Sequence, residues 1–282
     1  MDQTRHSWNS WEPLLLSSAL LVIFCPQRAG KSSAGNTILR TNLFDFKGSS
    51  RRTTHCEISH SMVENRRLTV VDSPGWFYMH TLQETNEMDK LELENSMYLC
   101  PSGPHAVLLV IHLTTAIQPV YLRAVQEHMS LFTEEIWKHT IALVTRGDWL
   151  GLKTVDERIE SEEGMQWIVN KCGNRYHVLN NMDHSDKAQV KDLLENIEEI
   201  WAENEKSYYE VNLSRTTEIE TKKRGWIQDG QKDKADNEGT VKSTERAEYH
   251  LNNSVILKNG PLVYLFLSMV FLCFLFYHCS HK

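Results

Sequence analysis

Strand-length apolar runs alternate with helix-periodic stretches along this sequence of 282 residues, and that alternation constrains its fold more than any other feature. The runs with strand character are 18–24, 58–63, 68–71, 107–113, 141–144 and 176–179. Helical periodicity occupies 31–39, 84–99, 120–132, 155–170 and 186–202. Near-continuous apolar strands are covered on both faces, and alternating β and α units build a mostly parallel sheet. The sequence therefore predicts an α/β fold with helices on both faces of the sheet, and ligands at the carboxyl ends of its strands.

The segment CPQRAGKSSAGNTIL, residues 25–39, begins at the end of the first predicted strand and runs through the first predicted helix. Gly30-Lys31-Ser32 matches the last three positions of the phosphate-binding pattern G-x-x-x-x-G-K-[ST]. Cys25 occupies the position of the first glycine in that pattern. In such a loop the backbone amides hold phosphates, the lysine reaches the β- and γ-phosphates, and the serine hydroxyl binds Mg²⁺. The candidate phosphate-binding residues are Arg28, Ala29, Gly30, Lys31, Ser32 and Ser33.

A second motif, Asp72-Ser73-Pro74-Gly75, follows the apolar run 68–71. A carboxylate at the tip of a buried strand, followed three residues later by glycine, is typical of the site that holds Mg²⁺ and senses a γ-phosphate in P-loop proteins. Asp72 is the candidate Mg²⁺ residue, and the amide of Gly75 is the candidate γ-phosphate contact. A plain turn is the alternative, because all four residue types favour turns.

A third motif, Thr145-Arg146-Gly147-Asp148, follows the apolar run 141–144. It is similar to the [N/T]-K-x-D turn whose carboxylate accepts hydrogen bonds from the N1–H and 2-amino groups of guanine, which adenine lacks. Asp148 is the candidate for that contact, with Thr145 beside it and the stem of Arg146 over the base. An exposed turn is the alternative. The order of the three motifs, each at a strand end, favours a guanine-nucleotide site.

Five segments resemble the GTPases of immunity-associated proteins: AGKSSAGNTIL, VVDSPGWF, SGPHAVLLVI, WKHTIALVTRGDWL and CGNRYHVLNN. The resemblance covers about residues 15–205 and implies an AIG-type, Ras-like P-loop GTPase domain that binds GTP or GDP with Mg²⁺. It adds Thr53 to Ser32 and Asp72 as a Mg²⁺ ligand. It makes Asn180 and Asn181 candidate guanine contacts. It also implies nucleotide-dependent homo- or hetero-oligomers with related GTPases and a role in immunity. Septins and chloroplast import GTPases are alternatives that lack several of these segments.

The sequence departs from the family pattern at positions that bear on phosphate binding and GTP hydrolysis. Cys25 and Arg28 replace loop glycines, and the segment HLTTAIQPVYL differs from a more charged, arginine-containing family segment. Trp76 follows Gly75, where Ras-type enzymes place a glutamine that orients the attacking water, and an indole offers one donor only. No catalytic side chain is identified beyond Lys31, which would stabilise phosphate charge. Any GTP hydrolysis is therefore expected to be slow, or to need a residue from another subunit.

The segment PLVYLFLSMVFLCFLFYHC, residues 261–279, contains no Asp, Glu, Lys or Arg. As a helix it would span roughly 28 Å, near the thickness of a bilayer core, and it is apolar on every side. It predicts a C-terminal transmembrane helix and a tail-anchored protein on the cytosolic face of an intracellular membrane. The charged residues 206–260 then form a flexible or partly helical linker, with a second small domain as the alternative. The apolar run 13–25 also has the character of a short signal peptide, but a buried strand explains it better.

Composition narrows the class of partner. The net charge is −7, which argues against nucleic-acid binding because that function usually needs a basic face. The six cysteines form no C-x-x-C and no zinc pattern, which suits a reduced compartment. The sequence favours a membrane-tethered guanine-nucleotide switch, in which nucleotide orders residues 45–56 and 72–90. The alternatives are a membrane scaffold that has kept the fold without nucleotide binding, and an ATP-binding protein, against which Asp148 argues.

Overall fold

The structure, a computed structural model, describes residues 16–27, 29–44, 53–100, 102–146, 154–183, 185–212 and 214–226. The chain divides into two compact units, Met1–Lys223 and Arg224–Lys282. The first unit holds the sheet and its helices. Of the second unit only residues 224–226 are described, and they are helical.

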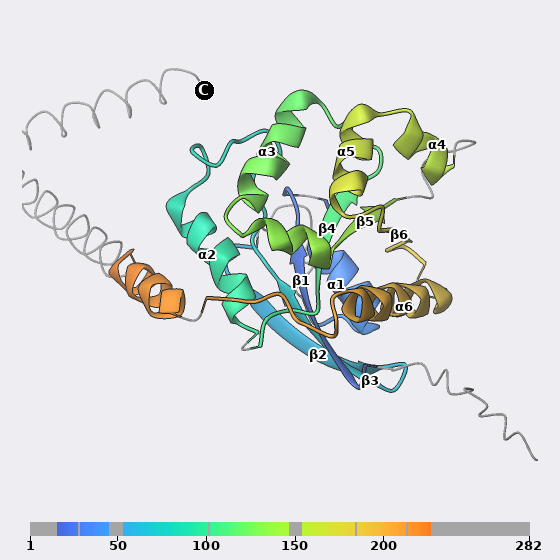
Figure 1. Ribbon diagram of the computed structural model, residues 1–282, viewed down its shortest axis with the longest axis horizontal. Helices are drawn as coiled ribbons and strands as arrows, with labels where there is room; N and C mark the ends of the chain where they lie inside the picture. The colour runs from blue at the N-terminus through green and yellow to red at the C-terminus, as the bar shows by residue number, and fades with distance from the viewer. Residues whose placement is uncertain are drawn as a thin grey trace, which may run out of the picture. The chain divides into compact units, whose positions relative to one another are not determined.

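The strands form one six-stranded sheet in the order β2-β3-β1-β4-β5-β6 (Figure 1). Their bounds are β1 Ser18–Phe24, β2 Glu57–Val63, β3 Arg66–Asp72, β4 Ala106–His112, β5 Thr140–Thr145 and β6 Tyr176–Leu179. Only β2 runs antiparallel to its neighbour, and every other pairing is parallel. The predicted strands and the mostly parallel α/β sheet are thereby confirmed.

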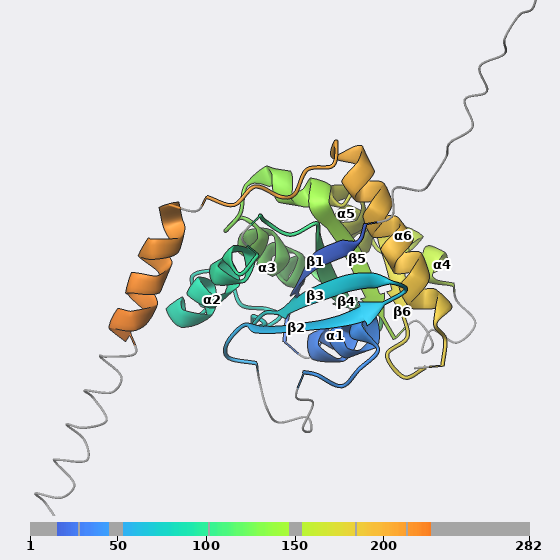
Figure 2. The ribbon, with the colours of Figure 1, turned by 90° about the horizontal axis from the view of Figure 1, so that it is seen from below.

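Helices cover both faces of this sheet (Figure 2). Their bounds are α1 Lys31–Leu39, α2 Glu87–Tyr98, α3 Pro119–Met129, α4 Val155–Glu160, α5 Glu163–Lys171 and α6 Ala188–Glu203, with a 3₁₀ helix η1 at Glu134–His139. Apolar side chains of α1 and α6 pack with one face of the strands. Side chains of α2, α3, α4, α5 and η1 pack with the other face.

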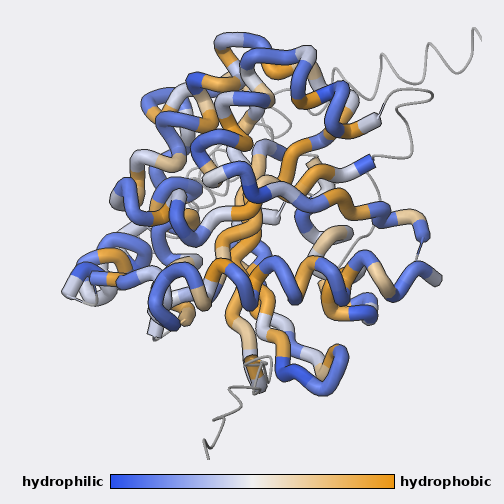
Figure 3. The backbone as a smooth tube through the Cα atoms, turned by 45° about the vertical axis from the view of Figure 1, so that its right-hand side comes forward, coloured by the Kyte–Doolittle hydropathy of each residue, from blue (hydrophilic) through white to orange (hydrophobic). Residues whose placement is uncertain are grey.

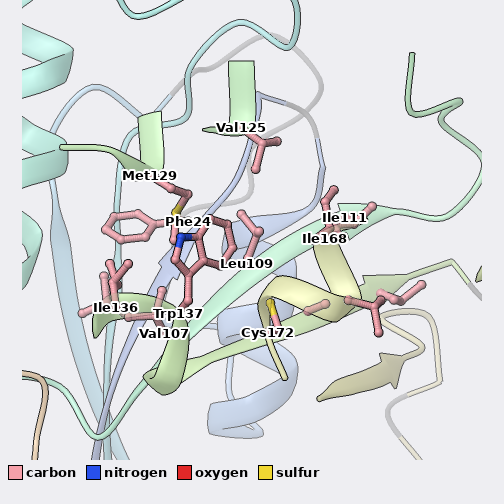
Figure 4. Packing of buried hydrophobic residues seen from close by; sticks show 14 of the residues in the cluster. Phe24, Val107, Leu109, Ile111, Val125, Met129, Ile136, Trp137, Ile168 and Cys172 are labelled. Atoms are coloured by element: carbon pink, nitrogen blue, oxygen red, sulfur yellow. The ribbon is translucent and has the colours of Figure 1, made fainter. Parts of the chain in front are cut away.

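The central strands supply much of the core, and their hydrophobic residues run through the middle of the domain (Figure 3). On the α3 side, Phe24, Leu109 and Trp137 belong to one packed cluster of buried side chains (Figure 4). The rings of Phe24 and Phe132 stack with centroids 5.2 Å apart. Each fully buried side chain of this size contributes about 1.5–3 kcal/mol of transfer free energy, so the sheet is a rigid base for the loops at its carboxyl edge.

The prediction of one continuous helix over residues 155–170 is wrong. The stretch 155–170 forms two helices, because Glu162 leaves the helical conformation with φ −133° and ψ 110°. Its carboxylate accepts a hydrogen bond of 2.6 Å from the backbone amide of Ile117. Gly164 then packs so tightly that a Cβ there would lie 2.5 Å from the Ile117 side chain. A tertiary contact with the β4–α3 connection therefore interrupts a periodicity that the sequence leaves unbroken.

The C-terminal predictions fall mostly outside the described residues. The proposed anchor, 261–279, and the linker beyond residue 226 are not among them. The helix at 214–226 lies within the predicted linker. Across the described ranges, no helix combines the length and the apolar character that crossing a bilayer requires.

Candidate nucleotide-binding site

The predicted phosphate loop connects β1 to α1 at the carboxyl edge of the sheet. Gly30 has φ 93°, a left-handed conformation that L side chains rarely adopt, so glycine is required there. Lys31 begins α1, and Gly30 offers no side chain to cap the helix. The amides of the first helical turn are therefore available to an anion. Arg28 lies outside the described residues.

Cys25 occupies the position of the missing first glycine without backbone strain. It is not among the described non-glycine residues with positive φ, which is the condition for a side chain to fit there. Its thiol is buried and donates a hydrogen bond of 2.7 Å to the carbonyl of Pro26. Burial raises the pKa of this thiol to about 11, although the ammonium of Lys31 opposes the rise. Cys25 is thus a neutral packing residue, and the loop keeps its course despite the substitution.

The predicted Mg²⁺ site lies around the carboxylate of Asp72, at the end of β3. Asp72 is only 1% exposed, and its Oδ2 accepts a hydrogen bond of 2.6 Å from the hydroxyl of Ser32. Burial raises the pKa of Asp72, and Lys31 together with the side chains of Ser32 and Thr53 opposes the rise. Its Oδ1 is buried and has no hydrogen-bond partner among the described residues. A buried carboxylate oxygen without a partner is costly, and a divalent cation ligated by oxygens satisfies it. The residues therefore fit Mg²⁺.

Lys31 and Gly75, the two predicted γ-phosphate contacts, lie against each other. The side chain of Lys31 is buried, and a Cβ at Gly75 would lie 2.8 Å from its Nζ. The same Cβ would lie 3.0 Å from the carbonyl of Cys25 and 3.0 Å from the amide of Gln27. Gly75 is therefore required by close approach to the phosphate loop rather than by its own backbone angles.

The predicted base-binding turn is fastened to the phosphate loop. The hydroxyl of Thr145, at the end of β5, donates a hydrogen bond of 3.1 Å to the carbonyl of Ala29. Arg146 follows in a left-handed conformation with φ 61°, which turns the chain sharply away from the strand. Asp148, the predicted guanine contact, lies outside the described residues. The turn after β5 therefore begins beside the phosphate loop.

The two asparagines after β6 have different surroundings. Asn181 lies beside α1, where its Oδ1 accepts a hydrogen bond of 3.1 Å from Thr37, and its Nδ2 lies 3.4 Å from the position of a Cβ at Gly30. Asn180 instead accepts from the amide of Met182 at 2.9 Å, which closes an Asx turn. Asn181 therefore lies at the site, and the side chain of Asn180 is engaged in shaping the loop.

Trp76 is turned away from the candidate site and into the core. It is 1% exposed, and its ring stacks on that of His128 in α3 with centroids 4.5 Å apart and an interplanar angle of 8°. Its indole nitrogen has no hydrogen-bond partner among the described residues. In this position the indole ring packs against α3, while the carbonyl of Trp76 accepts a hydrogen bond from the amide of Gln27 in the phosphate loop.

Two residues of the site escaped the sequence patterns. The hydroxyl of Ser73 donates to the carbonyl of Ile23 at 2.6 Å, which fixes the segment after β3 to the end of β1. Gln27, at an unconstrained position of the loop pattern, binds the Gly75–Trp76 segment through its backbone and side chain. Only the residue type of Ser73, in a turn-forming sequence, offered any signal. Gln27 offered none.

His105, in the segment SGPHAVLLVI, is structural. Its Nδ1 accepts a hydrogen bond of 3.0 Å from the amide of Leu20, which ties the entrance of β4 to β1. Burial, with a smaller effect of His139, lowers the pKa of His105 to about 4, so the ring is neutral and remains an acceptor. This contact supports the structural interpretation of His105, since it joins the ring to the backbone of β1.

A family model described as the AIG1 family matches residues 20–230. This chain belongs to the AIG1 family. Immune-associated nucleotide-binding protein 12 of Arabidopsis thaliana is 33% identical to it over 187 residues, which are 64% of this chain and 47% of that protein. GTPase IMAP family member 8 of Homo sapiens is 27% identical over 184 residues, which are 64% of this chain and 27% of that protein. The chain thus matches less than half the length of either of these relatives.

Solved structures show the same fold as this AIG1-family chain. The dimerization-deficient mutant of Toc33 from Arabidopsis thaliana has a TM-score of 0.55 at 14% identity, over 69% of this chain and 88% of that one. Toc33 in complex with Mg²⁺ and GMPPNP also has a TM-score of 0.55 at 14% identity, over 70% of this chain and 89% of that one. The P-loop GTPase fold and the AIG-type family that the quoted segments implied are confirmed.

Proposed function

We propose that this AIG1-family protein binds GDP or GTP together with Mg²⁺ at the loop between β1 and α1. The observation that carries the proposal is the hydrogen bond from Ser32 to the buried Asp72, whose Oδ1 has no partner among the described residues, with the Thr53 side chain near enough to lower the pKa of that carboxyl. Lys31 lies beside this group. Paired hydroxyls, a carboxylate, an ammonium and uncapped helix amides together form a magnesium–phosphate site.

The roles of the residues follow from their positions. The first-turn amides of α1 and the ammonium of Lys31 hold phosphate oxygens, while Ser32, Thr53 and Asp72 hold Mg²⁺, which neutralises phosphate charge. The turn from Thr145 to Asp148, with Asn181, binds the guanine. Names of relatives support this assignment, since they include immune-associated nucleotide-binding proteins and GTPase IMAP family member 8. Toc33 has been solved with GDP and Mg²⁺.

GTP hydrolysis by the isolated protein is proposed to be slow. Trp76 is buried against His128, so the position after Gly75 presents no carboxamide to an attacking water. A residue from a second subunit would then complete the site. Dimerization is important for the GTPase activity of the chloroplast translocon components atToc33 and psToc159, and this supports an oligomeric switch. The assembly is a nucleotide-dependent homo- or hetero-oligomer with related GTPases.

Membrane attachment is part of the proposal and rests on the sequence. Residues 261–279 are apolar throughout and would anchor the protein in an intracellular membrane with the GTPase domain on its cytosolic face. Alkaline carbonate extraction of cell membranes tests this directly. The full chain is expected to stay with the membrane pellet, and a chain ending at residue 260 is expected to be released. Release of the full chain would contradict the anchor.

Nucleotide binding is tested with the full chain in detergent micelles. Fluorescent GDP and GMPPNP are titrated with and without Mg²⁺, and the same titrations are made with Lys31→Ala and with Lys191→Ala. Lys191 is the matched control, because its side chain is 59% exposed in an ion pair on α6. Micromolar or tighter binding that Lys31→Ala alone abolishes supports the site. ATP that competes as well as GTP would contradict the assignment of the base-reading turn.

A scaffold without nucleotide is the second candidate function. One observation favours it: Gly75 and Trp76 pack directly on the phosphate loop, on the side where Lys31 would meet a γ-phosphate. This candidate predicts that wild-type protein, shown to be folded by its thermal transition, binds neither GDP nor GMPPNP. It also predicts that Mg²⁺ with nucleotide leaves the Tm unchanged, because only a ligand that binds the native state raises it.

A further inference from the structure

Gln27 joins the phosphate loop to the segment that follows β3. Its backbone amide donates a hydrogen bond of 2.6 Å to the carbonyl of Trp76. Its side-chain Nε2 donates another of 3.2 Å to the carbonyl of Gly75. Pro26 and Trp76 form an isolated parallel β-bridge at the same point. One loop residue thus holds two consecutive carbonyls of the opposite segment.

The segment of residues 73–76, which Gln27 contacts, is also held by the core and by β1. Trp76 stacks on His128, and the hydroxyl of Ser73 donates to the carbonyl of Ile23. Between these two contacts, Gly75 packs against Lys31 Nζ and the loop backbone so closely that a Cβ would be 2.8 Å from Nζ. The Gly75 backbone therefore occupies the space next to the Nζ atom of Lys31.

A diphosphate and a triphosphate make different demands on this arrangement. In a P-loop the backbone amides hold the inner phosphates, and the lysine reaches the β- and γ-phosphates. A diphosphate uses the amides, Lys31 and the Asp72 group, none of which requires Gly75 to move. A γ-phosphate adds oxygens beside Lys31 Nζ, where Gly75 now packs. Its entry has to break the hydrogen bonds from Gln27 before the Gly75 amide can turn to it.

We propose that Gln27 is a specificity-determining residue that favours GDP over GTP by holding Gly75 against the phosphate loop. The inference rests on the proposed nucleotide site and adds a direction to it, since the resting preference of the switch is for the diphosphate. The side-chain hydrogen bond is of ordinary strength, so its loss is expected to change the ratio of the two affinities by roughly 3- to 10-fold. The backbone bond to Trp76 survives any side-chain replacement except proline.

The experiment compares dissociation constants for GDP and GMPPNP, with Mg²⁺, for the full chain in detergent micelles. Gln27→Leu removes the donor and keeps the size of the side chain. Gln27→Asn keeps the carboxamide but withdraws it by one methylene. Gln126→Leu is the matched control, because Gln126 is exposed on the surface of α3. Thermal unfolding of each variant verifies that it is folded.

Both Gln27 variants are expected to bind GMPPNP more tightly relative to GDP, by roughly 3- to 10-fold for Gln27→Leu, while Gln126→Leu keeps the wild-type ratio. An unchanged ratio, or a shift toward GDP, in variants that still bind GDP overturns the role of Gln27 and leaves the nucleotide site standing. Wild-type protein that binds neither nucleotide overturns the proposed function, and this inference with it.

Discussion

At the residue scale, the candidate site depends on close packing of backbone against side chain. Gly75 illustrates this, since the Lys31 ammonium and two backbone atoms of the loop surround the space that a Cβ would need. No property of Gly75 alone reveals the crowding, because the contact joins segments far apart in the chain. Its replacement therefore tests the geometry of the site.

Gly75→Ala is expected to lower the free energy of unfolding by about 1–3 kcal/mol, because two of the three neighbouring atoms are backbone and cannot turn aside. Urea denaturation measures the change. Gly225→Ala is the control, since nothing lies within 4 Å of a Cβ there and alanine favours a helix by up to about 1 kcal/mol. Equal stability of Gly75→Ala and wild type would show that the loop and Gly75 are not in contact.

His128 supplies the pH dependence at this scale. Its Nδ1 lies 2.7 Å from the carbonyl of Ala124, which can only accept, so Nδ1 carries the proton and Nε2 accepts from the hydroxyl of Thr85 at 2.7 Å. Burial lowers the pKa of His128 from 6.5 to about 4. Between pH 6.5 and pH 4 the His128 imidazole is therefore protonated in the unfolded chain and neutral in the folded chain. The contribution of His128 to the free energy of unfolding is fully present above pH 6.5 and is lost as the pH falls toward 4.

The loss attributable to His128 is expected to reach at most about 3 kcal/mol on acidification from pH 7 to pH 4. Urea unfolding at several pH values measures it, with His128→Gln as the comparison. The variant should be less stable at neutral pH, since it loses the stack with Trp76, and should show a shallower decline with acid. Parallel pH profiles for the two proteins would exclude His128 as a source of the acid sensitivity.

At the scale of elements, the division of α4 from α5 shows a tertiary contact overruling local periodicity. Glu162 accepts from the amide of Ile117 and pairs with Arg158 at 2.6 Å, so its carboxylate satisfies two groups on different segments. Helix α4 itself begins as local sequence dictates, with Thr154 and Glu157 forming a capping box. The start of α4 is thus a local property, and its end is not.

Glu162→Ala is expected to lower the free energy of unfolding by about 1–3 kcal/mol, because the amide of Ile117 loses its acceptor in a partly buried position. Glu160→Ala is the control, since Glu160 is exposed on the neighbouring turn and its loss should change stability by less than about 0.5 kcal/mol. Chemical denaturation compares the two variants. Similar values for both would mean that the Glu162 contact contributes nothing to the fold.

At the scale of the whole molecule, two ion pairs connect α2 to the helical residues 214–223. Arg215 pairs with Glu94 at 2.7 Å, and Lys223 pairs with Glu92 at 2.5 Å. Glu92 is buried and also accepts a hydrogen bond of 3.1 Å from the amide of Cys56, just before β2. One carboxylate therefore links the segment after Thr53 to the part of the chain that leads toward the proposed anchor.

Lys223→Ala is expected to destabilise the protein by about 1–3 kcal/mol, because it removes the cation paired with a buried carboxylate. Lys222→Ala is the adjacent control. Its ion pair with Glu218 is an i,i+4 pair between half-exposed side chains, worth at most about 0.5 kcal/mol. Thermal or urea unfolding separates the two. A loss for Lys222→Ala as large as for Lys223→Ala would contradict the special position of Glu92.

The sequence by itself determined the order of the elements and which residues are candidates for binding phosphate and Mg²⁺. The run 18–24 and the stretch 31–39 coincide with β1 and α1, because apolar continuity and helical periodicity are local properties. Ser32 and Asp72 come into hydrogen-bond contact because parallel strands bring their carboxyl ends to one edge of the sheet.

Only the tertiary structure decided which side chains complete or restrain the site. Whether Cys25 fits the loop depends on the sign of its φ, and the inward turn of Trp76 depends on His128, which is distant in sequence. The role of Gln27 depends on the carbonyls of Gly75 and Trp76, which follow β3 and are distant from Gln27 in the sequence. Such contacts follow from close packing between remote segments, and a pattern that records residue types at fixed spacing contains no information about them.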